Sequence, residues 1–293
     1  MPNAEDVKEL REKTGAGILD CKDALTQTDT VEEAVEYLQK KGAEMADEIS
    51  DHTAAEGTVK VAADSSSNDV VLLEVNCETD FTARSDKFQA FAEKAAKQAV
   101  DNQTETVDAL RDIEIVSETV GDLEQTLTAD FGENIKIRRI KYIESQDGTI
   151  ETYLHGNSIG SVAVVDTPNT EGLAADIAKQ VAAMNPSFIS PGDAPKEEVA
   201  KMEEVFKGQM VEQGKPEHII PKIVEGKIKK WKKENALLTQ PYIRNTDLTV
   251  QEWIGQRDDE PEILKFARFE VGEGIETEEE NFAEEVMEQV SET

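Results

Sequence analysis

An apolar segment that runs into an acidic turn constrains the fold of this chain more than any other feature. Val70 to Val75 is rich in β-branched residues and follows the polar segment 65–69, which is the pattern of a buried strand. Helical spacing of apolar residues resumes at Phe88 and continues to Ala99. The sequence therefore predicts a strand, a connection from Thr79 to Asp86 and a helix, as in a domain that packs helices on a sheet.

Phe81, within this connection, has two interpretations. A large aromatic side chain in an Asp-bearing turn is a candidate wedge for insertion into a partner protein. Alternatively, Phe81 covers the local core while Asp80 or Ser85 caps the following helix, as is common in strand-to-helix loops. The pattern alone slightly favours the second interpretation.

Charge and size limit the classes of function. The 293 residues are 38% hydrophobic, enough for a substantial core. The 63 acidic residues outnumber the 31 basic ones and give a net charge of −32, which opposes general binding to nucleic acid or to an anionic membrane. The lysine-rich segment 227–233 is expected to be a solvated helix end rather than an RNA contact. Partners should therefore be met through specific contacts.

The sequence predicts a cytoplasmic protein without a membrane-spanning segment. Cys21 and Cys77 are the only cysteines, the first residues lack the basic and apolar regions of a signal peptide, and no apolar run approaches ~18 residues. We expect both cysteines to be small buried side chains and assign them no redox role.

Motifs for covalent, metal or nucleotide chemistry are sparse. The three histidines are scattered, and none stands at metal-ligand spacing with either cysteine. Gly15-Ala16-Gly17 follows a predicted helix rather than a strand, and the phosphate-cradling Gly-x-x-x-x-Gly-Lys loop is absent from the sequence. We expect no metal site, no cofactor and no direct binding of a nucleotide.

Periodicity outlines the first half of the chain. Three short helices are expected within the first 42 residues, with the N-cap of the third at Thr28-Asp29-Thr30 and its C-cap at Gly42. Residues 43–55 are expected to form a polar connector. Paired strands at 57–61 and 70–76 should follow, then a helix from Lys87 to Val100, a helix around Val120 and a strand at 135–143.

The second half partly repeats this order. Strands are expected at 150–155 and 161–165 and a helix at 173–184, which suggests a weak internal duplication. Residues 195–233 read as two helices with a break at Gly214-Lys215-Pro216, the pattern of an antiparallel hairpin. A strand at 264–271 and an amphipathic helix from Thr277 onward complete the prediction.

Two long motifs, at 10–22 and 74–81, stand in the order found in the translation elongation factor Ts family, which this sequence resembles. The shorter matching stretches are Gly132 to Ile135, His155-Gly156, Gly214 to Pro216, Val224 to Gly226 and Arg268 to Ile275. The resemblance therefore covers nearly the whole chain.

The resemblance implies an α+β fold in four parts. Residues 1–54 would form a three-helix bundle like the ubiquitin-associated fold, followed by core subdomains at 55–143 and 144–275. The helical hairpin, at 193–233, would be inserted in the second subdomain, and residues 276–293 would form a C-terminal helical module.

The implied function is guanine nucleotide exchange on elongation factor Tu, a GTPase that carries aminoacyl-tRNA. The factor would bind the GDP form, displace its Mg²⁺ ion and promote release of GDP so that GTP can bind. Such a protein performs no covalent chemistry of its own. The sequence leaves open whether it forms a homodimer and whether the hairpin touches the partner.

The resemblance also assigns residues. Thr79, Asp80, Phe81 and Thr82 match the segment implicated in dislodging Mg²⁺, with Phe81 as the wedge. Partner contacts are implied for Arg11, Ile18, Leu19, Asp20, Cys21, Lys22, Phe131, Gly132 and His155. The first six would grip the GTPase domain, the Phe131-Gly132 loop would approach its phosphate loop and His155 would meet a distant domain. Alternatively, Ile18, Leu19 and Cys21 are core residues of the helical bundle.

The chain departs from the family pattern in places. Residues 44–51 are acidic where the family usually carries lysines, and Thr82 stands where Val is usual. A salt-rich cytosol is one explanation for the acidity, because concentrated salt screens repulsion between surface charges.

Two rival functions remain on the sequence alone. A ubiquitin-associated adaptor would use only the first helices, and a cysteine-dependent hydrolase would need Cys21 or Cys77 beside a histidine. Neither rival explains a match over the whole chain.

Overall fold

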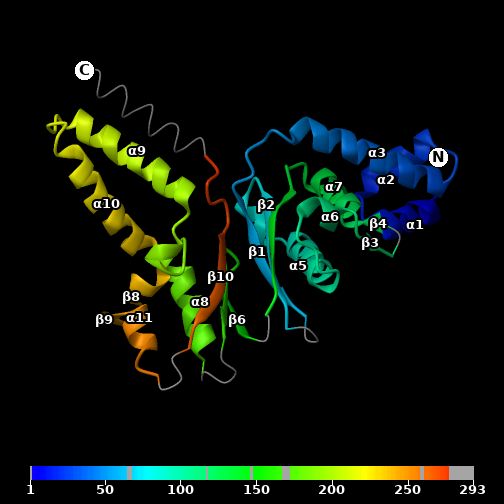
Figure 1. The fold of residues 1–293 in the computed structure, drawn as a ribbon. Helices are drawn as coiled ribbons and strands as arrows, with labels where there is room; N and C mark the ends of the chain where they lie inside the picture. Colours follow the sequence, from blue (N-terminus) through cyan, green and yellow to red (C-terminus); the bar gives the residue numbers. More distant parts are fainter. Residues whose placement is uncertain are drawn as a thin grey trace. The chain divides into compact units, whose positions relative to one another are not determined.

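A computed structural model describes residues 2–64, 68–116, 118–145, 148–166, 172–257 and 261–276 (Figure 1), without the side chains of residues 43 and 45–48. The described residues mix helices and strands, which confirms the predicted α+β class. They form two compact units. The first unit holds residues 1–144, 154–160 and the chain from 269, and the second holds 145–153 and 161–268. The predicted helix from Thr277 lies outside the described residues.

Three helices open the first unit: α1 (Ala4–Thr14), α2 (Ile18–Gln27) and α3 (Val31–Ile49). Asn3 caps α1 because its Oδ1 accepts hydrogen bonds from the backbone N–H groups of Glu5 and Asp6, at 2.7 and 2.8 Å. Gly15 ends α1 with a φ of 71°, a conformation that favours glycine. The predicted three-helix arrangement is confirmed, and its buried residues are Val7, Leu10, Ala16, Cys21, Ala24 and Ala34.

Gly42 does not end the third helix, so the prediction of a C-cap there was wrong. Helix α3 continues to Ile49, into the segment expected to be a polar connector. A Cβ atom at Gly42 would lie 3.5 Å from the Cβ of Ala129, which belongs to α7 (Val120–Phe131). Gly42 therefore lies where α3 packs against α7, at a distance that would also leave a Cβ atom in ordinary contact.

The first sheet has the order β1-β2-β5, built from β1 (Glu56–Ala63), β2 (Val70–Cys77) and β5 (Lys136–Ile143). Both pairings are antiparallel. Every residue of β2 is buried, as the apolar run predicted. Apolar side chains of the sheet pack with those of α5 (Asp86–Asp101) and α7, with Phe88 and Leu110 fully buried among them.

The connections in this unit contain short elements that the sequence did not predict. The Thr79 to Asp86 connection includes a five-residue helix, α4 (Asp80–Arg84). Between α5 and α7 the chain forms α6 (Val107–Arg111), β3 (Glu114–Ile115) and β4 (Glu118–Thr119).

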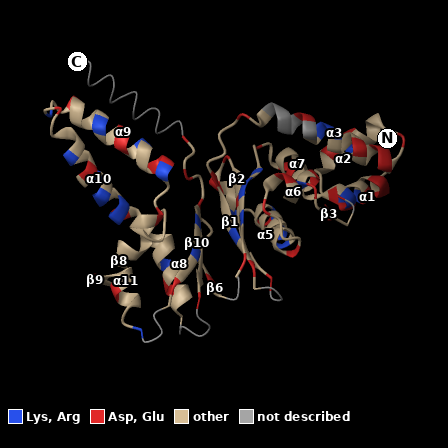
Figure 2. Cartoon of the chain, viewed as in Figure 1, with Lys and Arg blue, Asp and Glu red and all other residues tan. Residues whose placement is uncertain are grey.

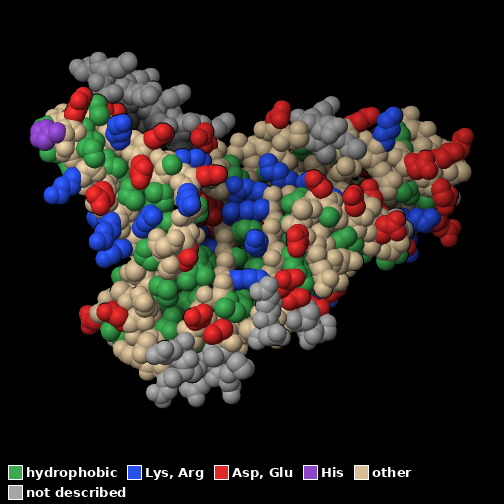
Figure 3. Space-filling view, in the orientation of Figure 1, with side chains coloured by type: hydrophobic (Ala, Val, Ile, Leu, Met, Phe, Trp, Pro, Cys, Tyr) green, Lys and Arg blue, Asp and Glu red, His purple; other side chains and the backbone are tan. Residues whose placement is uncertain are grey.

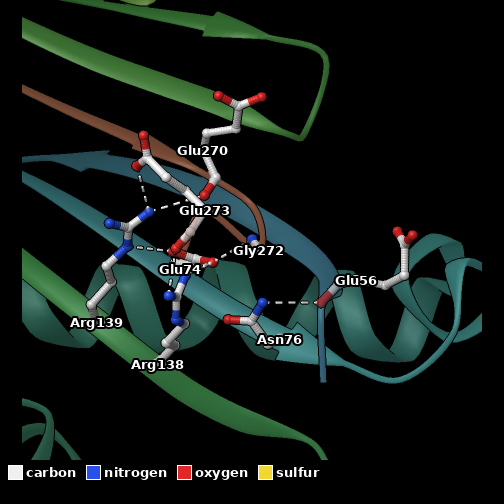
Figure 4. Close-up of polar contacts among 8 residues, drawn as sticks. All are labelled: Glu56, Glu74, Asn76, Arg138, Arg139, Glu270, Gly272 and Glu273. Atoms are coloured by element: carbon white, nitrogen blue, oxygen red, sulfur yellow. Dashed lines mark hydrogen bonds and ion pairs between the residues drawn. The ribbon is translucent and has the colours of Figure 1, made fainter. Parts of the chain in front are cut away.

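A buried carboxylate joins three segments of the first unit (Figure 4). Glu74 of β2 has no exposed side-chain surface, and it accepts hydrogen bonds from Arg138 Nη1 at 3.0 Å and from Arg139 Nε. The backbone N–H of Gly272 donates to the same carboxylate at 2.9 Å. Arg138 also donates to the carbonyl oxygen of Glu273 at 2.6 Å. The chain after the last strand is thereby fixed to β2 and β5.

The second sheet has the order β10-β7-β6, from β10 (Ile263–Glu270), β7 (Ile159–Val165) and β6 (Thr149–His155). In the second unit, β7 packs with α8 (Leu173–Met184) in a core that includes Ala163, Ile177 and Val181. The remaining elements of this unit are η1 (Pro191–Asp193), η2 (Leu237–Thr239), β8 (Pro241–Tyr242), β9 (Asn245–Thr249) and α11 (Val250–Ile254).

The predicted helical hairpin is confirmed. Helices α9 (Lys196–Glu212) and α10 (Ile220–Asn235) lie side by side, with Gly214 in the break at a φ of 67° (Figure 1). Met210 of α9 and Ile220 and Ile228 of α10 are buried. In the described part of the chain, no helix combines the length and apolar character that crossing a membrane requires.

Candidate functional site

The turn that follows β2 is built around one carboxylate. Thr79 is the N-cap of α4, and its Oγ1 accepts a hydrogen bond from the N–H of Thr82 at 3.3 Å. Glu133 accepts three more hydrogen bonds there: from the N–H of Thr79 at 3.1 Å, from Thr79 Oγ1 at 2.7 Å and from Thr82 Oγ1 at 2.8 Å. Both threonines are therefore used to shape the turn.

Phe81 projects from this turn into solvent. It is the second residue of α4, and 83% of its surface is exposed. The interpretation of Phe81 as a cover for the local core was therefore wrong. The same interpretation placed a helix cap at Asp80 or Ser85, and this is confirmed for Ser85. It caps α5 by accepting a hydrogen bond from the N–H of Phe88 at 3.3 Å. Asp80 instead forms a surface ion pair with Arg84, at 3.1 Å.

A second loop lies against the same turn. Helix α7 ends at Phe131, which is half-buried on the core, and Gly132 follows with a φ of 65°. No atom lies within 4 Å of the place a Cβ on Gly132 would occupy, so a neighbouring molecule can approach this backbone closely. Glu133 is the next residue, so the loop and the Phe81 turn are directly linked.

Asn134 and Glu78 join the two loops to each other and to the segment that follows α3. The Asn134 side chain donates hydrogen bonds to the carbonyl oxygens of Ser50 and His52, at 2.9 and 2.7 Å. Its N–H donates to Glu78 Oε1 at 2.7 Å, and His52 Nδ1 lies 3.0 Å from the same oxygen. Sequence reasoning gave no role to these residues or to Glu133, although the stretch Gly132 to Ile135 had been matched.

The N-terminal helices present an apolar pair. Ile18 and Leu19 lie in the first turn of α2 and are 49% and 80% exposed. Cys21 is fully buried, and its Sγ donates to the carbonyl oxygen of Ala16 at 3.7 Å. The core interpretation is therefore wrong for the first two residues and right for Cys21, which lies beneath the surface that the resemblance assigned to it.

The helical bundle also carries exposed charged residues. Arg11, Asp20 and Lys22 are exposed, and Asp20 is 3.4 Å from Lys41 of α3. Lys87 of α5 donates to the carbonyl oxygen of Gly15 at 3.4 Å and forms an ion pair with Asp130 of α7. The helical bundle is thereby tied to the two helices that flank the Phe81 turn. Figure 3 shows acidic side chains spread over the visible face of these N-terminal helices.

His155 lies at the end of β6, and its side chain is exposed. Its carbonyl oxygen accepts a hydrogen bond from Ser158 N at 3.4 Å, in the turn that leads to β7. The backbone N–H of Val59 donates to the carbonyl oxygen of Asn157 at 2.7 Å, which joins this turn to β1. His155 therefore belongs to the same unit as Phe81 and Leu19.

The cysteines are poor candidates for chemistry. Burial raises the pKa of the Cys77 thiol to about 12, and its Sγ donates to the carbonyl oxygen of Thr79 at 3.3 Å. Burial also raises the pKa of Cys21. Across the described ranges, no group of three or more His, Cys, Asp or Glu side chains is placed to hold a metal ion. The raised pKa values of both thiols therefore give no support to the alternative of a cysteine-dependent hydrolase.

The lysines of α10 gather toward its C-terminal half (Figure 2). Lys227 lies 5.0 Å from the centre of the Phe206 ring and Lys230 pairs with Glu234 at 3.5 Å, so contacts within the hairpin occupy both. Their position near a helix C-terminus is favourable in itself.

Comparison with known proteins places the chain in a family. A family model described as elongation factor TS matches residues 78–273. An elongation factor Ts from Halorhodospira halophila is 42% identical over 290 residues, 98% of each chain. That of Alkalilimnicola ehrlichii is 41% identical over 98% of each chain, and that of Methylococcus capsulatus is 42% identical over 97% of each. The chain belongs to the elongation factor Ts family of translation elongation factors.

Proposed function

We propose that this chain is a guanine nucleotide exchange factor that binds elongation factor Tu in its GDP form and promotes release of GDP. The observation that carries the proposal is Phe81, an exposed aromatic side chain on a short helix whose start is held by Glu133. Because these hydrogen bonds already order the backbone that carries Phe81, less backbone entropy is lost when a partner covers the side chain.

The mechanism is conformational. A GTPase holds GDP through a Mg²⁺ ion, a phosphate loop and switch segments, so a factor that binds a conformation lacking those contacts weakens the nucleotide. By thermodynamic reciprocity the nucleotide weakens the factor equally, and GTP can later expel it.

Each site residue has a proposed role in this cycle. Phe81 enters the partner and displaces the elements that position Mg²⁺, while Thr79 and Thr82 hold its helix. Asp80 accepts hydrogen bonds from the partner, and its exposed ion pair with Arg84 is readily given up because such pairs contribute ~0–1 kcal/mol. The backbone at Phe131-Gly132 approaches the phosphate loop.

The contacts with the GTPase domain are proposed to centre on Ile18 and Leu19. Arg11, Asp20 and Lys22 form the polar rim, and Cys21 supports α2 from inside the bundle. His155 contacts a more distant domain of the partner. We also propose the four-part division of the chain at 1–54, 55–143, 144–275 and 276–293. The factor would act in the cytoplasm and would perform no covalent chemistry itself.

The test is the rate at which elongation factor Tu of the same source releases a fluorescent GDP. Wild-type protein should accelerate release strongly. Phe81→Ala should lower the acceleration about 30-fold, because a buried aromatic anchor contributes ~2 kcal/mol or more. Val116→Ala removes another exposed apolar side chain of the same unit and should change nothing. Failure of wild-type protein to accelerate release would refute the proposal.

A further inference from the structure

Glu133 controls the geometry of the Phe81 turn from a distant part of the sequence. Its carboxylate accepts hydrogen bonds from Thr79 and Thr82, which precede it by 54 and 51 residues. One oxygen accepts from both hydroxyl groups, and the other accepts from the N–H of Thr79. The donors bracket Asp80 and Phe81, so this carboxylate helps to fix the backbone that carries the aromatic side chain.

Helix α4 needs such a tertiary contact. It has five residues, fewer than an isolated helix requires in water. Its own cap, the bond from Thr82 N–H to Thr79 Oγ1, is 3.3 Å long, whereas the hydroxyl groups lie 2.7 and 2.8 Å from Glu133. The two hydroxyl contacts have the usual O–H···O distance, whereas the cap bond is longer than the usual N–H···O distance. Glu133 therefore contributes more than the local cap to the orientation of α4.

The backbone on both sides of Glu133 is itself fixed. Gly132 ends α7, with its N–H donating to the carbonyl oxygen of Thr128 at 2.8 Å. Asn134 is buried and bonded to Glu78, Ser50 and His52. Glu133 thus holds the Phe81 turn in a set relation to the Phe131-Gly132 loop.

We propose that Glu133 is a positioning residue for nucleotide exchange, one that orients Phe81 and makes the two partner-contacting loops act as one rigid element. The inference rests on the proposed exchange function. In this proposal Glu133 affects the opening of the nucleotide site. It does not affect the binding of the partner through Ile18 and Leu19.

Two conservative variants separate geometry from charge. Glu133→Gln keeps the length of the side chain: its amide oxygen can accept from Thr79 N–H while its NH₂ group donates to the threonine hydroxyls. Glu133→Asp keeps the charge but is shorter by one bond, about 1.5 Å, and cannot reach the same donors. If Glu133 acts by positioning, the Gln variant should promote exchange at nearly the wild-type rate, and the Asp variant should promote it more slowly.

The experiment measures GDP release from elongation factor Tu over a range of factor concentrations, which separates kcat from KM. Glu133→Ala and Glu133→Asp should lower kcat at least about tenfold with KM changed less than about threefold, since the lost contact acts when the nucleotide site opens. Glu133→Gln should stay within about threefold of wild type in both. Glu105→Ala, at an exposed glutamate of the same unit, is the matched control.

A double mutant shows whether Glu133 acts through Phe81. Glu133→Ala combined with Phe81→Ala should exchange no more slowly than Phe81→Ala alone, because residues acting as one unit are not additive. Independent, additive losses would overturn the inference, as would a normal Asp variant beside an impaired Gln variant. If the Ala variant does not fold, the Gln and Asp pair decides. Wild-type protein without exchange activity would instead refute the proposed function itself, and the inference with it.

Discussion

Substitution of Glu74 by Ala should destabilise the first unit strongly. The carboxylate is fully buried and is satisfied by two guanidinium groups of β5 and by the N–H of Gly272. Its removal deprives Arg138 and Arg139 of their common acceptor, and Arg139 keeps an ion pair with Glu273 at 3.3 Å. It also releases the N–H of Gly272, which helps to fix the chain after β10.

The magnitude follows from burial. Removing one partner of a buried ion pair costs ~3–5 kcal/mol, because the other charge is left uncompensated. The Arg138 and Arg139 side chains keep 22% and 30% of their surface exposed, so water can partly solvate them once Glu74 is gone. We therefore expect a loss near the lower end, about 3 kcal/mol in the free energy of unfolding. At ~2–4 °C per kcal/mol for a unit of this size, the Tm should fall by about 6–12 °C.

Urea unfolding followed by far-ultraviolet circular dichroism measures this loss. Tryptophan fluorescence is unsuitable, because Trp231 and Trp253 both belong to the second unit. Glu114→Ala, at an exposed glutamate in strand β3 of the same unit, is the matched control and should change stability by less than ~0.5 kcal/mol. A loss below ~1 kcal/mol for Glu74→Ala would refute the assignment of Glu74 as a structural joint.

Two further measurements probe the charge and the cysteine chemistry. Burial raises the pKa of Cys77 from its ordinary 9.0 to about 12, so the neutral thiol favours the folded state below pH 9 and this contribution is lost as pH rises from 9 to 12. The stability difference between wild type and Cys77→Ala should shrink over that range, and a constant difference would show that burial does not shift the thiol. The net charge of −32 predicts that Tm rises as KCl increases from ~0.1 to ~1 M, because the screening length falls from ~10 to ~3 Å. A flat or falling Tm would argue against a surface adapted to salt.

Features set by local periodicity were predictable from the sequence. The continuous apolar run of β2 indicated a buried strand, and Gly214-Lys215-Pro216 indicated the break in the hairpin. The C-cap predicted at Gly42 was wrong because α3 continues to Ile49 while packing on α7, a tertiary contact that no local pattern reveals. Helix α4 was missed because its five residues depend on Glu133, far away in the sequence.

The candidate site was predictable in part. The spacing of Cys21 and Ala24 on one face of α2 matches their common burial and could have separated Cys21 from the exposed Leu19. The exposure of Phe81 could not be read from its surroundings, because the pattern of an aromatic residue after an acidic turn slightly favours a place in the core. Glu133 drew attention only as part of a matching stretch, since hydrogen bonds across more than 50 residues leave no spacing signal.

The central claim is that Phe81 promotes GDP release by displacing the Mg²⁺ of the partner, and the most direct test compares release with and without Mg²⁺. In the presence of Mg²⁺, wild-type protein should accelerate GDP release about 30-fold more than Phe81→Ala does. When a chelator has removed Mg²⁺, the ion no longer holds the nucleotide, so most of this difference should disappear. An equal ratio of wild type to Phe81→Ala under both conditions would contradict the account.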